Sequence, residues 1–78
     1  MKTVKILGSG CKRCVAAADM AQQAAHRLGI AITLEKVTDH AAIAAYGVAA
    51  TPCVVVDGKV VHAGGLPSHE NMTKWLAA

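Results

Sequence analysis

Aromatic residues are nearly missing from this 78-residue sequence, which has one Trp, one Tyr and no Phe. Hydrophobic residues still make up 54% of the chain, which is too large a share for a disordered segment. A core must therefore be built from Val, Ile, Leu and Ala, and such a core suits a thin sandwich with close contact between helix and strand. The length predicts one small domain, residues 1–78.

Long apolar runs are also absent. Nothing approaches the roughly 18–20 apolar residues of a membrane span. Residues 4–10 are too short for the apolar region of a secretory signal, and a charged segment with cysteines follows them directly. We therefore expect a cytoplasmic protein that makes no contact with a membrane.

Acidic residues are absent before Asp19, and the net charge is +3. Half of the basic residues lie in the first thirteen positions, as Lys2, Lys5, Lys12 and Arg13. This stretch has no aromatic residue for base stacking and no continuous basic run, so we do not expect nucleic-acid binding.

Cysteine is scarce, with three residues in the chain. An odd number cannot pair completely within one chain. In a reducing compartment this count favours catalytic or metal chemistry over a structural disulfide framework.

Alternating and helical patterns predict seven elements separated by Gly, Pro and Asp turns. We expect strands at 3–7, 30–37, 53–56 and 59–63. Helices are expected at 12–28, in a short segment that Thr38 or Asp39 caps and that runs to about Tyr46, and after Pro67 and Ser68. The order β-α-β-α-β-β-α predicts an α/β fold with a four-stranded mixed sheet and helices on both faces.

Several packing details follow from the same patterns. The first helix is expected to bury one face, formed by Val15, Ala18, Ala21 or Gln22, Ala25 and Leu28. In the second strand, Ile30, Ile32 and Leu34 should share a face. Residues 53–56 form a continuous apolar run typical of a strand that is buried on both sides, and Asp57-Gly58 is a hairpin signal. Met72, Trp75 and Leu76 should face inward.

The motif with the clearest chemistry is Cys11-Lys12-Arg13-Cys14, where the first strand ends and the first helix begins. A helix N-terminus stabilises a thiolate, and Lys12 and Arg13 add positive charge beside it. Both effects should lower the pKa of Cys11 from a free value of about 8.5. We expect Cys11 to attack disulfides. Cys14 lies inside the first turn and should be more buried, so we expect it to resolve the mixed disulfide.

Two other interpretations of the pair remain open. A structural disulfide would close only a tiny loop and would add little stability. Two thiolates at this spacing can also hold part of a soft-metal site. Cys53 is a candidate third thiol, so Cys11, Cys14 and Cys53 form an alternative site for a soft metal or arsenic(III); the plainer interpretation is that Cys53 is a small core residue.

The segment Tyr46 to Pro52, followed by an apolar strand and an Asp-Gly turn, resembles the thioredoxin superfamily over nearly the whole chain. The resemblance is to its small, glutaredoxin-sized redox-disulfide proteins, and it implies a minimal thioredoxin fold. By position, Cys11 and Cys14 match the dithiol of that family. Thr51 and Pro52 match its cis-proline step, which offers backbone groups to an extended substrate.

The resemblance implies a thiol-disulfide oxidoreductase, with electron transport through a redox-active disulfide. Its partners would be a disulfide-containing protein or a small thiol substrate, together with a reductase that the sequence does not identify. We expect no cofactor and a monomer. The sequence departs from thioredoxins in having Lys12 and Arg13 between the cysteines and no acidic residue on the first strand.

Overall fold

Seven elements follow one another in a computed structural model that describes residues 2–8, 12–48 and 50–77. They are β1 (Lys2–Leu7), α1 (Lys12–Leu28), β2 (Ile32–Val37), α2 (His40–Ala45), β3 (Cys53–Val56), β4 (Lys59–Ala63) and α3 (His69–Ala77). The predicted order β-α-β-α-β-β-α is confirmed. The bounds of α1, β3 and β4 agree with those expected from the sequence.

The four strands form one sheet in the order β2-β1-β3-β4. β1 and β2 are parallel, with Lys2 opposite Ile32 and Leu7 opposite Val37. β3 is antiparallel to both β1 and β4. The crossover through α1 permits the parallel pairing of β1 and β2, whereas the two-residue hairpin makes β3 and β4 antiparallel. The sheet is mixed because β3, which lies next to β1, runs antiparallel to it.

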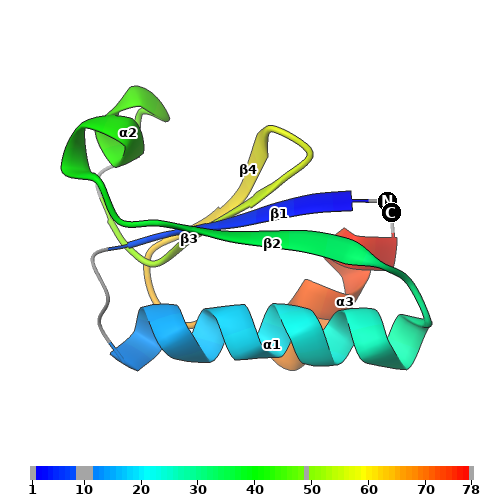
Figure 1. Ribbon diagram of the computed structural model, residues 1–78. Coiled ribbons are helices and arrows are strands. Elements are labelled where there is room, and N and C mark those ends of the chain that lie inside the picture. Colours follow the sequence, from blue (N-terminus) through cyan, green and yellow to red (C-terminus); the bar gives the residue numbers. More distant parts are fainter. Residues whose placement is uncertain (1, 9–11, 49, 78) are drawn as a thin grey trace.

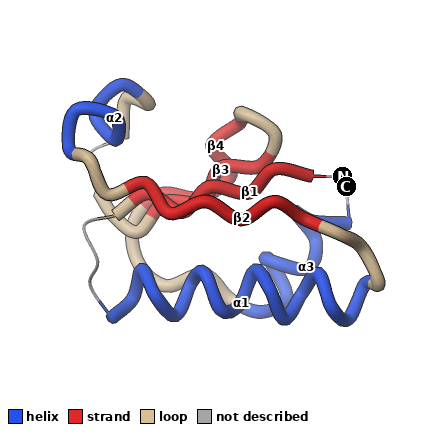
Figure 2. Tube along the Cα trace, in the orientation of Figure 1, coloured by secondary structure: helices blue, strands red, loops and turns tan. Residues whose placement is uncertain are grey.

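Helices cover the two faces of the sheet unequally. α1 and α3 lie side by side on one face, and the short α2 lies on the other, beyond one end of the sheet (Figure 1, Figure 2). The larger core cluster joins the first face to α1 and α3 through residues that include Val4, Ile6, Ala21 and Met72. The smaller cluster lies under α2 and contains Leu7, Ile43, Cys53 and Val55.

The buried face of α1 agrees with the predicted one at Ala18, Ala21 and Ala25, and differs at two positions. Val15 is 45% exposed and Gln22 is exposed, so both were wrong as core positions. The buried residues are Cys14, Ala17, Ala18, Met20, Ala21, Ala24 and Ala25. The stripe runs through positions three and four apart, starting from Cys14. Val15 lies about 100° further round the helix and therefore points outward.

β2 begins later than expected, and Ile30 was wrongly placed on its core face. Ile30 is 37% exposed and precedes the strand. Its N–H donates to the carbonyl of Ala25 (3.1 Å), and the N–H of Gly29, which has φ +67°, donates to that of His26 (3.1 Å). This pair of bonds is the Schellman pattern that closes a helix, so the chain is still turning at Ile30. Ile32 and Leu34 do pack on the larger cluster.

The expected turn and caps are confirmed. Asp57 (φ 49°) and Gly58 (φ 83°) form the two-residue loop between β3 and β4. Of the two candidate caps of α2, the structure uses Asp39, whose carboxylate accepts a hydrogen bond from Ala42 N (3.1 Å). Among the described helices, none combines the length and the apolar character required to cross a membrane.

Candidate active site at the N-terminus of helix α1

Cys14 is brought to the end of β1 by the first turn of α1. It is the third residue of that helix and is 5% exposed. The prediction that Cys14 is buried is therefore confirmed. Cys11, the other half of the motif, lies outside the described residues, as do Ser9 and Gly10.

Gly8 makes this approach possible. Its N–H donates to the carbonyl of Val37 (2.9 Å), which extends the pairing of β1 and β2 by one residue. A Cβ atom on Gly8 would overlap Cys14 Sγ and would lie 3.7 Å from Thr51 Cβ. Gly8 is thus the point at which the second cysteine and the Thr51–Pro52 loop meet.

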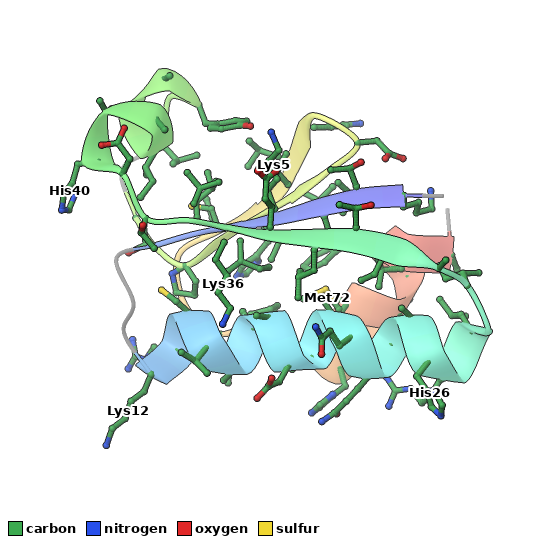
Figure 3. The ribbon with its side chains drawn as sticks, viewed as in Figure 1. Lys5, Lys12, His26, Lys36, His40 and Met72 are labelled. Atoms are coloured by element: carbon green, nitrogen blue, oxygen red, sulfur yellow. The ribbon has the colours of Figure 1, made fainter. Side chains whose placement is uncertain are left out.

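Positive charge surrounds the beginning of α1. Lys12 and Arg13 are exposed, and the first turn contains no acidic residue (Figure 3). The ion pairs among the described residues are Lys2–Asp57 (3.7 Å), Lys5–Glu35 (3.8 Å) and Lys74–Glu70 (3.6 Å). None of them involves the cations of this first turn. The end of the helix dipole is therefore supplemented by side-chain charge rather than neutralised by it.

Thr51 and Pro52 form the opposite side of the site. The peptide bond between them is cis. Pro52 is fully buried and Thr51 is exposed. The Pro52 carbonyl accepts a hydrogen bond from Gly64 N (3.0 Å), whereas no hydrogen bond involves the Thr51 backbone within the described part of the chain. Of this pair, Thr51 therefore has the backbone groups that are open to another molecule.

Gly64 directly follows β4 and contacts this loop. It has φ +82°, and a Cβ atom there would lie 3.0 Å from Ala50 Cβ. Any other residue would combine an unfavourable backbone conformation with a tight contact against the loop. The loop that contains the cis bond is therefore held by a glycine outside the Cys motif.

The structure does not bring Cys53 together with Cys14. Cys53 is fully buried with Leu7, Ile43 and Val55 on the α2 side of the sheet, whereas α1 packs on the other side. Its Sγ donates to Ala50 O (2.6 Å). Burial raises the pKa of the Cys53 thiol, and the backbone N–H of Gly64 opposes part of that effect. These observations favour the interpretation of Cys53 as a core residue.

Metal ligands do not gather elsewhere either: residues 2–8, 12–48 and 50–77 contain no cluster of three or more His, Cys, Asp or Glu side chains suited to a metal ion. The proposed three-thiol set includes Cys11 and therefore lies partly outside these residues.

Sequence reasoning missed Gly8, Gly64 and Lys36 as parts of this region. Gly8 had a usable signal, since a glycine directly after an apolar strand and before the Cys motif marks a close approach of the backbone. Gly64 is followed by Gly65, and a glycine pair after a strand indicates a strand-ending bulge rather than a contact with a distant loop. Lys36, which lines a small cavity together with Cys14, had no local signal, because its position depends on how β2 pairs with β1.

Comparisons with known proteins extend over the whole chain. The profile of a family described as a thioredoxin domain matches residues 2–77. Thioredoxin from Methanocaldococcus jannaschii is 36% identical over 76 residues, covering 97% of this chain and 87% of that protein. Thioredoxin from Methanothermobacter thermautotrophicus is 32% identical over 77 residues, covering 99% and 100%.

Among solved structures, glutaredoxin 1 from Francisella tularensis, complexed with cacodylate, aligns with a TM-score of 0.46 and 22% identity. The alignment covers 99% of this chain and 93% of that one. The similarity to the two thioredoxins covers 97% and 99% of this chain, so it is not confined to the Cys motif.

Proposed function

The chain belongs to the thioredoxin family, and from that premise we propose that it is a thiol-disulfide oxidoreductase in which Cys11 and Cys14 alternate between dithiol and disulfide. The observation that carries this proposal is the contact of Cys14 Sγ with the Gly8 position, beside Thr51. It supports a resolving thiol buried next to the loop at which a substrate can bind.

In the proposed reaction Cys11 is the attacking thiol. It directly precedes α1, whose first turn has no acidic residue and carries the exposed Lys12 and Arg13. The helix dipole and these two charges favour the thiolate over the thiol. The Cys11 thiolate attacks a substrate disulfide, a mixed disulfide forms, and the first substrate sulfur leaves with the electron pair.

Cys14 then completes the exchange. Its buried position supports a thiol that is shielded from outside disulfides and reacts once the mixed disulfide is in place. It forms a bond to the Cys11 sulfur and releases the second substrate sulfur. Two electrons pass from the dithiol to the substrate, and a reductase or a small thiol returns them.

Thr51 is proposed to orient the substrate. Its exposed position and unused backbone groups support pairing with an extended segment next to the disulfide. Pro52 contributes the buried cis bond that turns the loop toward Gly8, while its carbonyl is already bonded to Gly64. The substrate class is accordingly a disulfide-containing protein or a small disulfide, and we propose a monomer acting in the cytoplasm.

The alternative of a soft-metal or arsenic(III) module gains nothing from the position of Cys53. Its thiol lies on the α2 side of the sheet and is already hydrogen-bonded to Ala50 O. Cys53 therefore gives no support to that function.

Trapping of mixed disulfides tests the proposal. Cys14→Ser should accumulate a covalent complex with a disulfide substrate such as insulin through Cys11, because the resolving sulfur is gone. Cys11→Ser should form no complex and should lose insulin reduction with dithiothreitol as the donor. The matched control is Cys53→Ala, which should behave like the parent protein in both assays. Equal trapping through Cys11 and Cys14, identified by mass spectrometry, would contradict the assigned roles.

A further inference from the structure

The half-buried His62 of β4 lies between helix α3 and the turn that follows β4. Its ring contacts the ring of Trp75 in α3, with 5.5 Å between the ring centroids and 36° between the ring planes. Its Nε2 atom lies 3.0 Å from the carbonyl oxygen of Gly65. The turn that it contacts adjoins the Thr51–Pro52 loop through the hydrogen bond from Gly64 N to Pro52 O.

An irregularity in the pairing of β3 with β4 brings His62 to this position. Val55 pairs with Val60, whereas Val54 pairs with His62, so Val61 is an extra residue in β4. In a regular strand, residues two apart share a face, and His62 would lie with Val60 on the α2 side. Because the extra residue shifts this alternation, His62 instead lies opposite Val54, on the side of α1 and α3. A β-bulge next to an active site commonly re-aims a side chain in this way.

The hydrogen bond between His62 and Gly65 has a defined direction. A carbonyl oxygen can only accept, so Nε2 of His62 carries a proton and donates to Gly65 O. Nε2 donates both in this neutral tautomer and in the protonated ring, so the bond requires a donor at this position and not a charge. In the part of the chain that the structure describes, no other side chain bonds to this carbonyl oxygen.

The turn bonded to His62 consists of two consecutive glycines. Gly64 has φ +82° and Gly65 has φ +76°. Glycine enters this left-handed conformation easily and also leaves it easily, because it has no Cβ atom to restrict the backbone. Two such residues in sequence have no side chain of their own to fix the turn. The restraint therefore comes from outside the pair, and the bond from His62 supplies it.

Gly64 connects the position of this turn to that of the Thr51–Pro52 loop. Its N–H donates to Pro52 O (3.0 Å), and a Cβ atom on it would lie 3.0 Å from Ala50 Cβ. Thr51 lies between these two contacts, and its own backbone makes no hydrogen bond within the described residues. The orientation of the Thr51 backbone therefore depends on where Gly64 lies.

We infer that His62 is a positioning residue for substrate binding: its Nε2–H holds the Gly64–Gly65 turn against the Thr51–Pro52 loop, so that the Thr51 backbone is aligned for an extended substrate segment. The inference rests on the proposed function. His62 acts through the turn and not by contact with the substrate. Substrates that are bound through their backbone should therefore depend on His62, whereas small disulfides, which offer no extended segment, should not.

A purely structural role for His62 makes the opposite prediction. In that case its ring serves to pack against Trp75, which itself packs on the larger core cluster. His62→Phe keeps an aromatic ring beside Trp75 and removes the donor. His62→Gln removes the ring and keeps an N–H donor that can reach the position of Nε2. A packing role predicts that His62→Gln is the more impaired variant, whereas the positioning role predicts that His62→Phe is.

The first measurement is the reduction of insulin with dithiothreitol as the donor, with kcat and KM determined separately. His62→Phe should raise KM for insulin by about 3- to 10-fold, the effect of losing one hydrogen bond, and should leave kcat within about 2-fold. His62→Gln should keep KM within about 2-fold of the parent protein, because the donor is retained. Reduction of a chromogenic aromatic disulfide should stay within about 2-fold in both variants, since that substrate has no backbone to align.

His26→Phe is the matched control, because it makes the same replacement far from the site. His26 is exposed in the last turn of α1, at the opposite end of that helix from Lys12 (Figure 3). This variant should retain the insulin KM of the parent protein. Trp75 is the single tryptophan of the sequence, so its fluorescence confirms that each variant is folded.

The second measurement requires no turnover. Hydrogen exchange of the Gly64 amide reports how firmly the turn is held, because this N–H is bonded to Pro52 O. His62→Phe should speed this exchange by about 10-fold through local opening, whereas His62→Gln and His26→Phe should not. The Asp57 amide, bonded to Thr3 O (2.8 Å) at the other end of the hairpin, is the internal reference and should exchange at the parent rate in every variant.

The inference is overturned if His62→Phe keeps the insulin KM of the parent protein, or if His62→Gln is as impaired as His62→Phe. Equal losses with insulin and with the aromatic disulfide would also overturn it, because the effect would then not lie in the binding of an extended substrate. If the parent protein reduces neither substrate, the proposed function is refuted. Exchange of the Gly64 amide still shows in that case whether His62 holds the turn, and an unchanged rate in His62→Phe would refute the inference as well.

Discussion

Gly8 is the residue on which the approach of Cys14 to the end of β1 depends. A side chain there would occupy the space that now holds Cys14 Sγ, and the nearest atoms beyond it belong to Cys14 and Thr51. The position lies outside the left-handed backbone region, so its need for glycine comes from space and not from conformation. The catalytic geometry is therefore sensitive to a single methyl group next to the motif.

Gly8→Ala should lower both stability and disulfide exchange. The added methyl group must displace Cys14 or the strand end, an overpacking cost of about 1–3 kcal/mol in the free energy of unfolding. Because Cys14 Sγ moves, the resolving rate should also fall by roughly 10-fold, the consequence of a small misplacement of a reacting atom. Chemical denaturation measures the change in stability. The resolving rate is measured by mixing the reduced protein with a chromogenic aromatic disulfide and following release of its second aromatic thiol.

Gly58→Ala provides the matched control for that substitution. Gly58 lies in the β3–β4 turn with φ +83°, and nothing lies within 4 Å of a Cβ atom built there. Its replacement should cost about 1 kcal/mol through backbone strain and leave the exchange rate unchanged. If Gly8→Ala retains the exchange rate of the parent, the contact with Cys14 has no part in the reaction.

At the scale of elements, α1 owes its close packing to alanine. Ala17, Ala21 and Ala24 are completely buried against the sheet and α3. The helix pattern in the sequence left Ala21 and Gln22 as alternatives for one core position, because an alanine-rich helix has little contrast in hydrophobicity between neighbouring positions. The sheet decides between them, since only one of the two can point toward it.

Ala21→Leu should destabilise the protein, whereas Gln22→Leu should not. Ala21 has no space around it, so the larger side chain forces α1 away from the sheet at a cost of about 1–3 kcal/mol. Gln22 is exposed, and leucine is an equally good helix former, so the change there should stay within about 0.5 kcal/mol. Thermal unfolding measures the stability of the two variants. Equal losses of stability would show that Ala21 does not lie on the buried face of α1.

At the scale of the whole molecule, the two faces of the sheet are covered to different depths. α1 and α3 bury a large continuous cluster, while α2 contributes Ile43 as its buried residue (Figure 1). β1 and β3 occupy the centre of the sheet, and all four residues of β3 are buried. Because α2 covers its face of the sheet only thinly, we expect the end of the sheet near α2 to open locally more easily than the rest of the structure.

Native-state hydrogen exchange should follow this asymmetry. The amides of β1 and β3 should exchange most slowly, close to the rate set by global unfolding, because both strands are paired on two sides. The amides of α2 should exchange through local opening, on the order of 100-fold faster, since a six-residue helix with little buried surface costs little to open. Equal protection of α2 and β3 would show that the domain opens only as a unit.

The order of elements, the α1 bounds, the hairpin turn and the position of the Cys motif at a helix start were all determined by the sequence. Each of these depends on local chemistry: side-chain periodicity, the backbone freedom of Gly58, and the need for caps at helix ends. The family resemblance added the Thr51–Pro52 loop, whose neighbour Gly8 lies more than 40 residues before it in the chain (51 − 8 = 43) and has no local connection to it.

Which side of each element faces which layer follows from the packing of the complete fold. β3 is buried on both faces, so its sequence could not reveal that Cys53 lies under α2 and away from α1. The same reason applies to Lys36, whose side of β2 depends on the pairing with β1, and to Gly8, whose neighbours come from α1 and the Pro52 loop. Contacts between distant segments depend on how the layers are stacked, and no short stretch of sequence contains that information.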